Sequence, residues 1–125
     1  MSPLVQHPAL PFLVLALVGW FLPRALQRVA GLVAASLALA AISGLPDGTS
    51  VGILRFGHDW LLLSMDGLSR LFGYAFAGYA FVATVYAWSD DDRSAAPTQA
   101  ALVAGALLVV TAGDLLTLFI GWEWL

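Results

Sequence analysis

Glu123, a carboxylate within an apolar helical run, has the clearest potential for chemistry in this chain. The run begins after Asp114 and contains only one other polar side chain, Thr117, before Glu123. Nine residues of α-helix rise about 13.5 Å, close to half of a hydrocarbon core about 30 Å thick. An ionisable group at that depth is energetically costly and by default marks an ion or proton pathway. We therefore predict that Glu123 is a mid-membrane proton relay.

The surroundings of Glu123 decide whether it can take and release a proton. Burial raises the pKa of a carboxyl group and a nearby cation lowers it, so a balanced group can titrate near neutral pH. Helical spacing puts Glu123 on a face with Leu116, Phe119 and Ile120, where no polar side chain is available as its partner. The compensating cation must come from elsewhere. The alternative is an interfacial helix, or a helix end that exposes Glu123 to water.

Three further charged residues are candidate site residues. Asp114 precedes Glu123 by nine positions, about 180° around the helix, so the two carboxylates cannot pair. We predict that Asp114 caps the helix, with a proton entry or exit point as the alternative. Asp66 and Arg70 are four residues apart and are predicted to be a capping pair rather than part of a conduction path.

The composition is that of an integral membrane protein. Hydrophobic residues make up 61% of the chain and charged residues 10%, whereas a soluble domain has about a quarter charged residues. Cysteine is absent, which excludes disulfides and thiolate-bound metals. The two histidines, His7 and His58, are far apart and predicted to lie at the surface. We expect no cofactor, no metal and no nucleic-acid partner for this chain.

The apolar segments predict an all-α membrane protein with four transmembrane helices and a truncated fifth. Pro23 and Arg24 separate the first two segments, Pro97 opens the fourth, and Gly113 ends it. Alanine-rich runs in the second and fourth segments indicate faces where helices approach closely. The predicted spans cover about residues 8–22, 24–43, 67–88, 97–112 and, incompletely, 114–125 of this single N-terminal unit.

The segment between the second and third spans differs from the others. Pro46-Asp47-Gly48 is a turn signal. Two apolar runs, 51–56 and 60–65, flank Gly57-His58-Asp59 and predict a β-hairpin with a three-residue loop. An interfacial amphipathic turn is the alternative.

Arginine positions predict the orientation. Arg24 and Arg28 lie in the first link and none lies before the first span. Basic residues favour the cytoplasmic side, so we predict a multi-pass protein of the inner (plasma) membrane with its N-terminus and the hairpin-like loop outside.

The strings Asp66-Gly67-Leu68-Ser69, Ala112-Gly113-Asp114-Leu115-Leu116-Thr117-Leu118-Phe119 and Trp122-Glu123 occur in an order that resembles a known family. The chain is similar to the N-terminal part of the antiporter-like membrane subunits of complex I, membrane-bound hydrogenases and Mrp-type cation/proton antiporters.

The resemblance implies a larger subunit of two inverted repeats in which Glu123 matches an essential glutamate. That glutamate pairs with a lysine on a later helix, and partner membrane subunits supply the drive. Protons, with Na⁺ as a further candidate, would be the transported ions, and the chain itself would hold no catalytic centre. The alternative function is a small structural or assembly membrane protein that only packs with partner helices.

Overall fold

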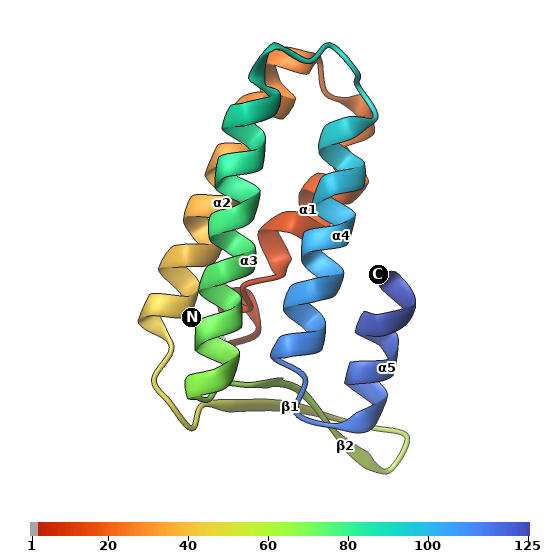
Figure 1. The fold of residues 1–125 in the computed structure, drawn as a ribbon. Coiled ribbons are helices and arrows are strands. Elements are labelled where there is room, and N and C mark those ends of the chain that lie inside the picture. Colours follow the sequence, from red (N-terminus) through yellow and green to blue (C-terminus); the bar gives the residue numbers. More distant parts are fainter. Residues whose placement is uncertain (1–2) are drawn as a thin grey trace.

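The computed structural model describes residues 3–125, and these form a mostly helical bundle closed at one end by a two-stranded hairpin (Figure 1). The five α-helices are α1 Leu10–Val18, α2 Arg24–Gly44, α3 Gly67–Tyr86, α4 Ala95–Val110 and α5 Leu115–Trp124. The strands are β1 Ser50–Arg55 and β2 His58–Ser64, and short 3₁₀ turns occupy Pro3–Gln6, Gly19–Phe21 and Ala87–Ser89.

Among residues 3–125, only two helical segments are long and apolar enough to cross a membrane, so four transmembrane helices are not supported. These two are α2, with 21 residues, and α3 with its 3₁₀ extension, 23 residues ending at Ser89. The first segment stops at Phe21 and α4 has 16 residues, about 24 Å against a core of about 30 Å. After α4, the backbone carbonyl of Thr111 accepts a bond from the Ser64 amide of β2. The chain therefore turns to pair with the hairpin instead of continuing the helix.

The predicted hairpin is confirmed, but its loop is shorter than predicted. Arg55 pairs directly with His58, which leaves Phe56 and Gly57 as a two-residue turn. Both have positive φ, 54° and 77°, as the tight turns that match strand twist require. His58 and Asp59, assigned to the loop from the sequence, belong to β2 instead.

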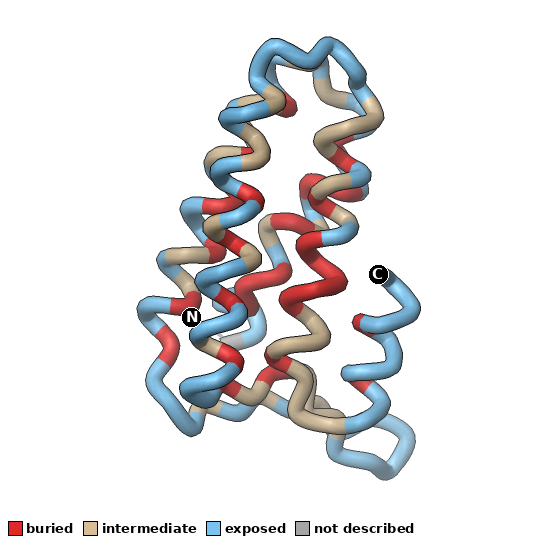
Figure 2. The backbone as a smooth tube through the Cα atoms, viewed as in Figure 1, coloured by how far each residue is buried: buried red, intermediate tan, exposed pale blue. Residues whose placement is uncertain are grey.

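Small side chains form much of the bundle core. Ala35 and Ala38 of α2, Ala77 of α3 and Ala104 of α4 are completely buried. Figure 2 shows such buried positions along the inner faces of the helices, while α5 is exposed over most of its surface. The alanine-rich faces expected from the sequence therefore do pack helix against helix.

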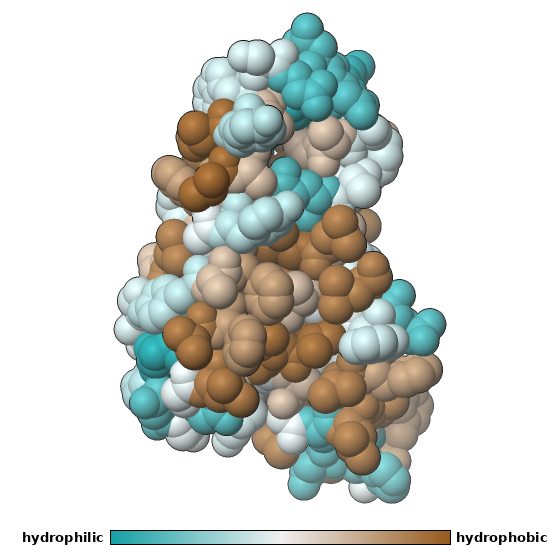
Figure 3. All heavy atoms as spheres, in the orientation of Figure 1, coloured by the Kyte–Doolittle hydropathy of each residue, from teal (hydrophilic) through white to brown (hydrophobic). Residues whose placement is uncertain are grey.

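The outer surface keeps large apolar side chains in contact with solvent. Val33, Leu37, Val82 and Phe119 are all about half exposed or more. On the face drawn in Figure 3, hydrophobic residues cover the middle and hydrophilic residues gather at the two ends. An exposed apolar surface of this kind indicates a face that meets lipid or other apolar helices.

Candidate functional site

Helix α5 carries Glu123 and lies against the C-terminal half of α4. Two glycines allow the approach: a Cβ at Gly121 would lie 3.0 Å from the Leu108 Cβ, and one at Gly105 would lie 3.1 Å from the Trp124 ring. Because Gly105 lies within α4 rather than at its end, α5 ends part-way along the bundle, as Figure 1 shows. Glu123 therefore lies between the two ends of the bundle.

Glu123 faces away from the bundle. It is exposed, and so are Leu116, Phe119 and Ile120, the residues that share its helix face. The two salt bridges formed by the described residues involve other carboxylates. Glu123 is thus an outward-facing carboxylate within an apolar surface.

The arginines lie near the two ends of the bundle, as the sequence suggested. Arg24, Arg28 and Arg93 belong to the end where the link between α1 and α2 meets the loop between α3 and α4. Arg55 lies beside the hairpin turn and Arg70 in the first turn of α3. Within residues 3–125, none of these arginines is paired with Glu123.

Asp114 caps α5, and it also binds the hairpin. One carboxylate oxygen accepts from the Thr117 amide at 2.7 Å and the other accepts from the Leu61 amide at 2.6 Å. The Thr117 bond is the main cause that lowers the pKa of Asp114. Burial opposes this effect, and the Leu61 bond, which has a smaller effect than burial, lowers the pKa further. The predicted cap is confirmed. The alternative role in proton entry stays a prediction.

Asp66 is also a helix cap, but its predicted ion pair with Arg70 is wrong. The Asp66 carboxylate accepts from the Ser69 amide at 2.7 Å, and this bond lowers the pKa of Asp66. Arg70 instead pairs with Asp47 at 2.7 Å. It also donates to the carbonyl of Ile42, and to that of Leu45, at the end of α2. Arg70 therefore acts as a C-terminal cap for α2. The four-residue spacing of Asp66 and Arg70 in the sequence did not indicate this long-range contact.

His7 is buried, contrary to the surface position predicted for it, whereas His58 is exposed as predicted. The His7 Nδ1 accepts from the Ala9 amide at 3.2 Å and its Nε2 lies 3.2 Å from the Leu62 carbonyl. This pattern suits a neutral imidazole that donates from Nε2 and accepts at Nδ1. Desolvation by burial lowers the pKa of His7, and the bond to Leu62 offsets part of that effect.

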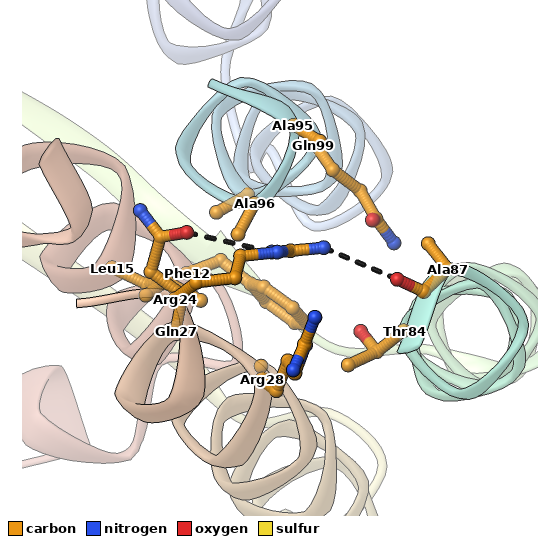
Figure 4. A pocket seen from close by; sticks show the side chains of 12 residues that line it. Phe12, Leu15, Arg24, Gln27, Arg28, Thr84, Ala87, Ala95, Ala96 and Gln99 are labelled. Carbon is orange, nitrogen blue, oxygen red and sulfur yellow. Dashed lines mark hydrogen bonds between the residues drawn. The ribbon is translucent and has the colours of Figure 1, made fainter. Parts of the chain in front are cut away.

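A polar cluster ties α2 to the loop between α3 and α4 at the arginine end (Figure 4). Arg24 donates to the carbonyls of Asp90 at 2.7 Å and Ala87 at 3.1 Å, and to the Gln27 side chain at 3.4 Å. The fully buried Gln27 amide donates to the Arg93 carbonyl at 2.9 Å. The sequence analysis did not identify Gln27. Its amide lies on the alanine-rich face of an apolar helix, and a polar side chain at such a position indicates a buried hydrogen bond.

Among residues 3–125, no three side chains of His, Asp or Glu come together as metal ligands would. Comparison with protein-family models, with curated proteins and with solved structures finds no match to this chain.

Proposed function

We propose that this chain is part of a proton-translocating membrane subunit of a respiratory or antiporter complex, with Glu123 as its proton relay. The observation that carries the proposal is the position of Glu123, an outward-facing carboxylate on the apolar face of α5. Two of the arginines are paired with other carboxylates, Arg70 with Asp47 and Arg28 with Asp91. The family resemblance of the sequence points to the same role.

The mechanism follows from the charge balance at Glu123. In the proposed mechanism, a cation on a neighbouring helix moves towards Glu123 and away from it, and Glu123 releases and takes up a proton in step. Movement of that cation would therefore load and unload Glu123, and the driving energy would come from partner membrane subunits. Protons are the proposed cargo, with Na⁺ as the counter-transported ion in an antiporter complex.

The proposed setting is the inner (plasma) membrane, crossed several times, with the N-terminus outside. Within residues 3–125, two helices have the length and apolarity to cross a membrane, and the other three would pack beside them. Three arginines gather at the end that contains Asp90 and Asp91, against two near the hairpin end. The arginine-rich end would therefore face the cytoplasm.

The second candidate function is structural: a membrane protein that packs with partner helices and moves no ion. The exposed Phe119 and Trp122 of α5 favour it, because such side chains could form a helix interface around Glu123. The two functions differ in whether Glu123 must lose a proton.

The deciding experiment is Glu123→Gln in the full-length protein within its complex, reconstituted in vesicles. Glutamine keeps the size and hydrogen-bonding capacity of the side chain but cannot lose a proton. We expect proton translocation to be abolished while assembly is retained, and we expect the exposed hairpin variant Asp59→Asn to translocate at the normal rate. Translocation by Glu123→Gln at the wild-type rate would rule out Glu123 as the proton relay.

A further inference from the structure

Gly78, in α3, differs from the other glycines that lie inside the helices. A Cβ at Gly78 would meet no atom within 4 Å, apart from the backbone of α3 itself. At the other interior positions a Cβ would come within 2.9–3.1 Å of a side chain on a neighbouring helix, and these positions are Gly31, Gly73, Gly105 and Gly121. Glycine weakens a helix interior relative to alanine, and close helix packing explains those four. Among residues 3–125, no neighbouring helix explains Gly78.

Gly78 lies on an exposed, apolar face of α3. Helical spacing places Leu71, Ala75, Val82 and Val85 around it. Leu71, Val82 and Val85 are 64%, 66% and 51% exposed, and Ala75 is also exposed. Figure 2 shows exposed positions along the whole of α3. We call these five residues the Gly78 face. No charged residue occurs between Leu71 and Ser89, so the face is free of charge along its length.

A helix explains a glycine on this face better than lipid does. Lipid chains cover an alanine or a leucine as well as a glycine, whereas a missing side chain lets the backbone of a second helix come close. Gly78 also lies at the middle of the segment Gly67–Ser89, which is long and apolar enough to cross a membrane. Two inclined helices that cross at this depth can both span the bilayer. The Gly78 face therefore suits a second membrane-spanning helix.

We propose that this second helix is α3 of another copy of the chain. Two copies in one membrane have the same orientation, so their α3 helices would run parallel about a two-fold axis and each residue would meet its counterpart. Gly78 would meet Gly78 at the crossing, and no like charges would be opposed because the face has none. The exposed face of α5 would instead bring two Glu123 carboxylates together. The outer face of α2 offers no interior glycine, since Gly31 already packs against Thr84.

The test is disulfide cross-linking in membranes. The chain has no cysteine, so single cysteines report which faces of two copies meet. With a membrane-permeant oxidant, Ala75→Cys and Val82→Cys in the full-length protein should each give a disulfide-linked dimer on a non-reducing gel. The control is Val33→Cys, which is 49% exposed on the outer side of α2 and should remain monomeric.

A second change at Gly78 itself separates specific pairing from random collision. The space beside Gly78 in the single bundle is open, so Gly78→Leu should leave the melting temperature of the monomer in detergent unchanged while blocking the approach of a second α3. It should lower the cross-linked fraction of Val82→Cys at least tenfold, whereas Gly78→Ala, which keeps a small side chain, should retain the cross-link.

Three results would overturn the proposal. These are the absence of a dimer from both Ala75→Cys and Val82→Cys, equal cross-linking of Val33→Cys, and a Val82→Cys cross-link that Gly78→Leu leaves unchanged. None of these measurements depends on proton translocation by Glu123, so the pairing of two α3 helices and the proposed function can fail separately.

Discussion

The carboxylate of Asp114 joins the start of α5 to the backbone of Leu61 in β2, 53 positions earlier in the chain, through a hydrogen bond of 2.6 Å. The Gly113 amide donates to the Leu61 carbonyl at 3.1 Å, so both the amide and the carbonyl of Leu61 bond to this segment. The helix that carries Glu123 is thus fixed to the hairpin rather than only to α4.

We predict that Asp114→Ala lowers the free energy of unfolding by about 1–3 kcal/mol, because a helix cap is lost and the Leu61 amide loses its acceptor. Asp114→Asn should lower the free energy of unfolding by less, since asparagine also caps helices well. The measurement is thermal or denaturant unfolding in detergent, with the exposed Asp59→Ala as control. Equal stability of Asp114→Ala and the control would contradict the dual role of this carboxylate.

Stability should depend on pH through His7. Because burial lowers the pKa of His7 below its ordinary value of 6.5, the unfolded chain binds a proton at a higher pH than the folded chain does. The contribution of His7 is therefore complete above pH 6.5 and decreases as the pH falls towards the folded-state pKa. The groups that bond to the ring, from Ala9, Leu62 and Thr111, are all uncharged.

The measurement for His7 is the melting temperature between pH 8 and pH 5. His7→Gln should be less stable than the unmodified protein at pH 8 and should lose part of the decline below pH 6.5. His58→Gln, on the exposed strand β2, is the control and should keep that decline. Identical pH profiles for the two variants would show that His7 does not titrate as the structure implies.

Gly121→Ala should separate α5 from α4. A Cβ at Gly121 would lie 3.0 Å from both the Leu108 Cβ and the Val109 backbone nitrogen, which cannot move without displacing a helix. Gly78, within α3, has open space where a Cβ would be placed, so Gly78→Ala should be neutral or stabilising by up to about 1 kcal/mol. The measurement is the unfolding midpoint of each variant. A Gly121→Ala variant as stable as Gly78→Ala would contradict the close packing of α5 on α4.

The proposed orientation can be tested with single cysteines in the full-length protein. Asp91, with a side chain 94% exposed, reports the arginine end of the bundle, and His58 reports the hairpin end. On intact cells, an impermeant thiol reagent should label His58→Cys and not Asp91→Cys. Both should be labelled after the membrane is opened, and the reverse pattern on intact cells would invert the orientation.

The sequence by itself determined the local elements. Pro23 and Gly113 lie between helices as predicted, Asp66 and Asp114 are caps, and the alanine-rich faces pack. These features depend on residues within one or two turns of each other, where backbone sterics and unpaired amides leave few choices. The presence of the β-hairpin also followed from two apolar runs that flank a glycine-containing loop.

Only the tertiary structure decided how those elements are joined. Arg70 caps α2 and pairs with Asp47, His7 is buried against Leu62, and Asp114 reaches Leu61. The length of α4 was likewise set by the pairing of Thr111 with Ser64 in β2. Each of these contacts joins residues at least 23 positions apart, so neither helical periodicity nor residue type indicates it. Buried polar groups bond to whichever partners folding brings within reach, and that choice is made by the packing of the whole bundle.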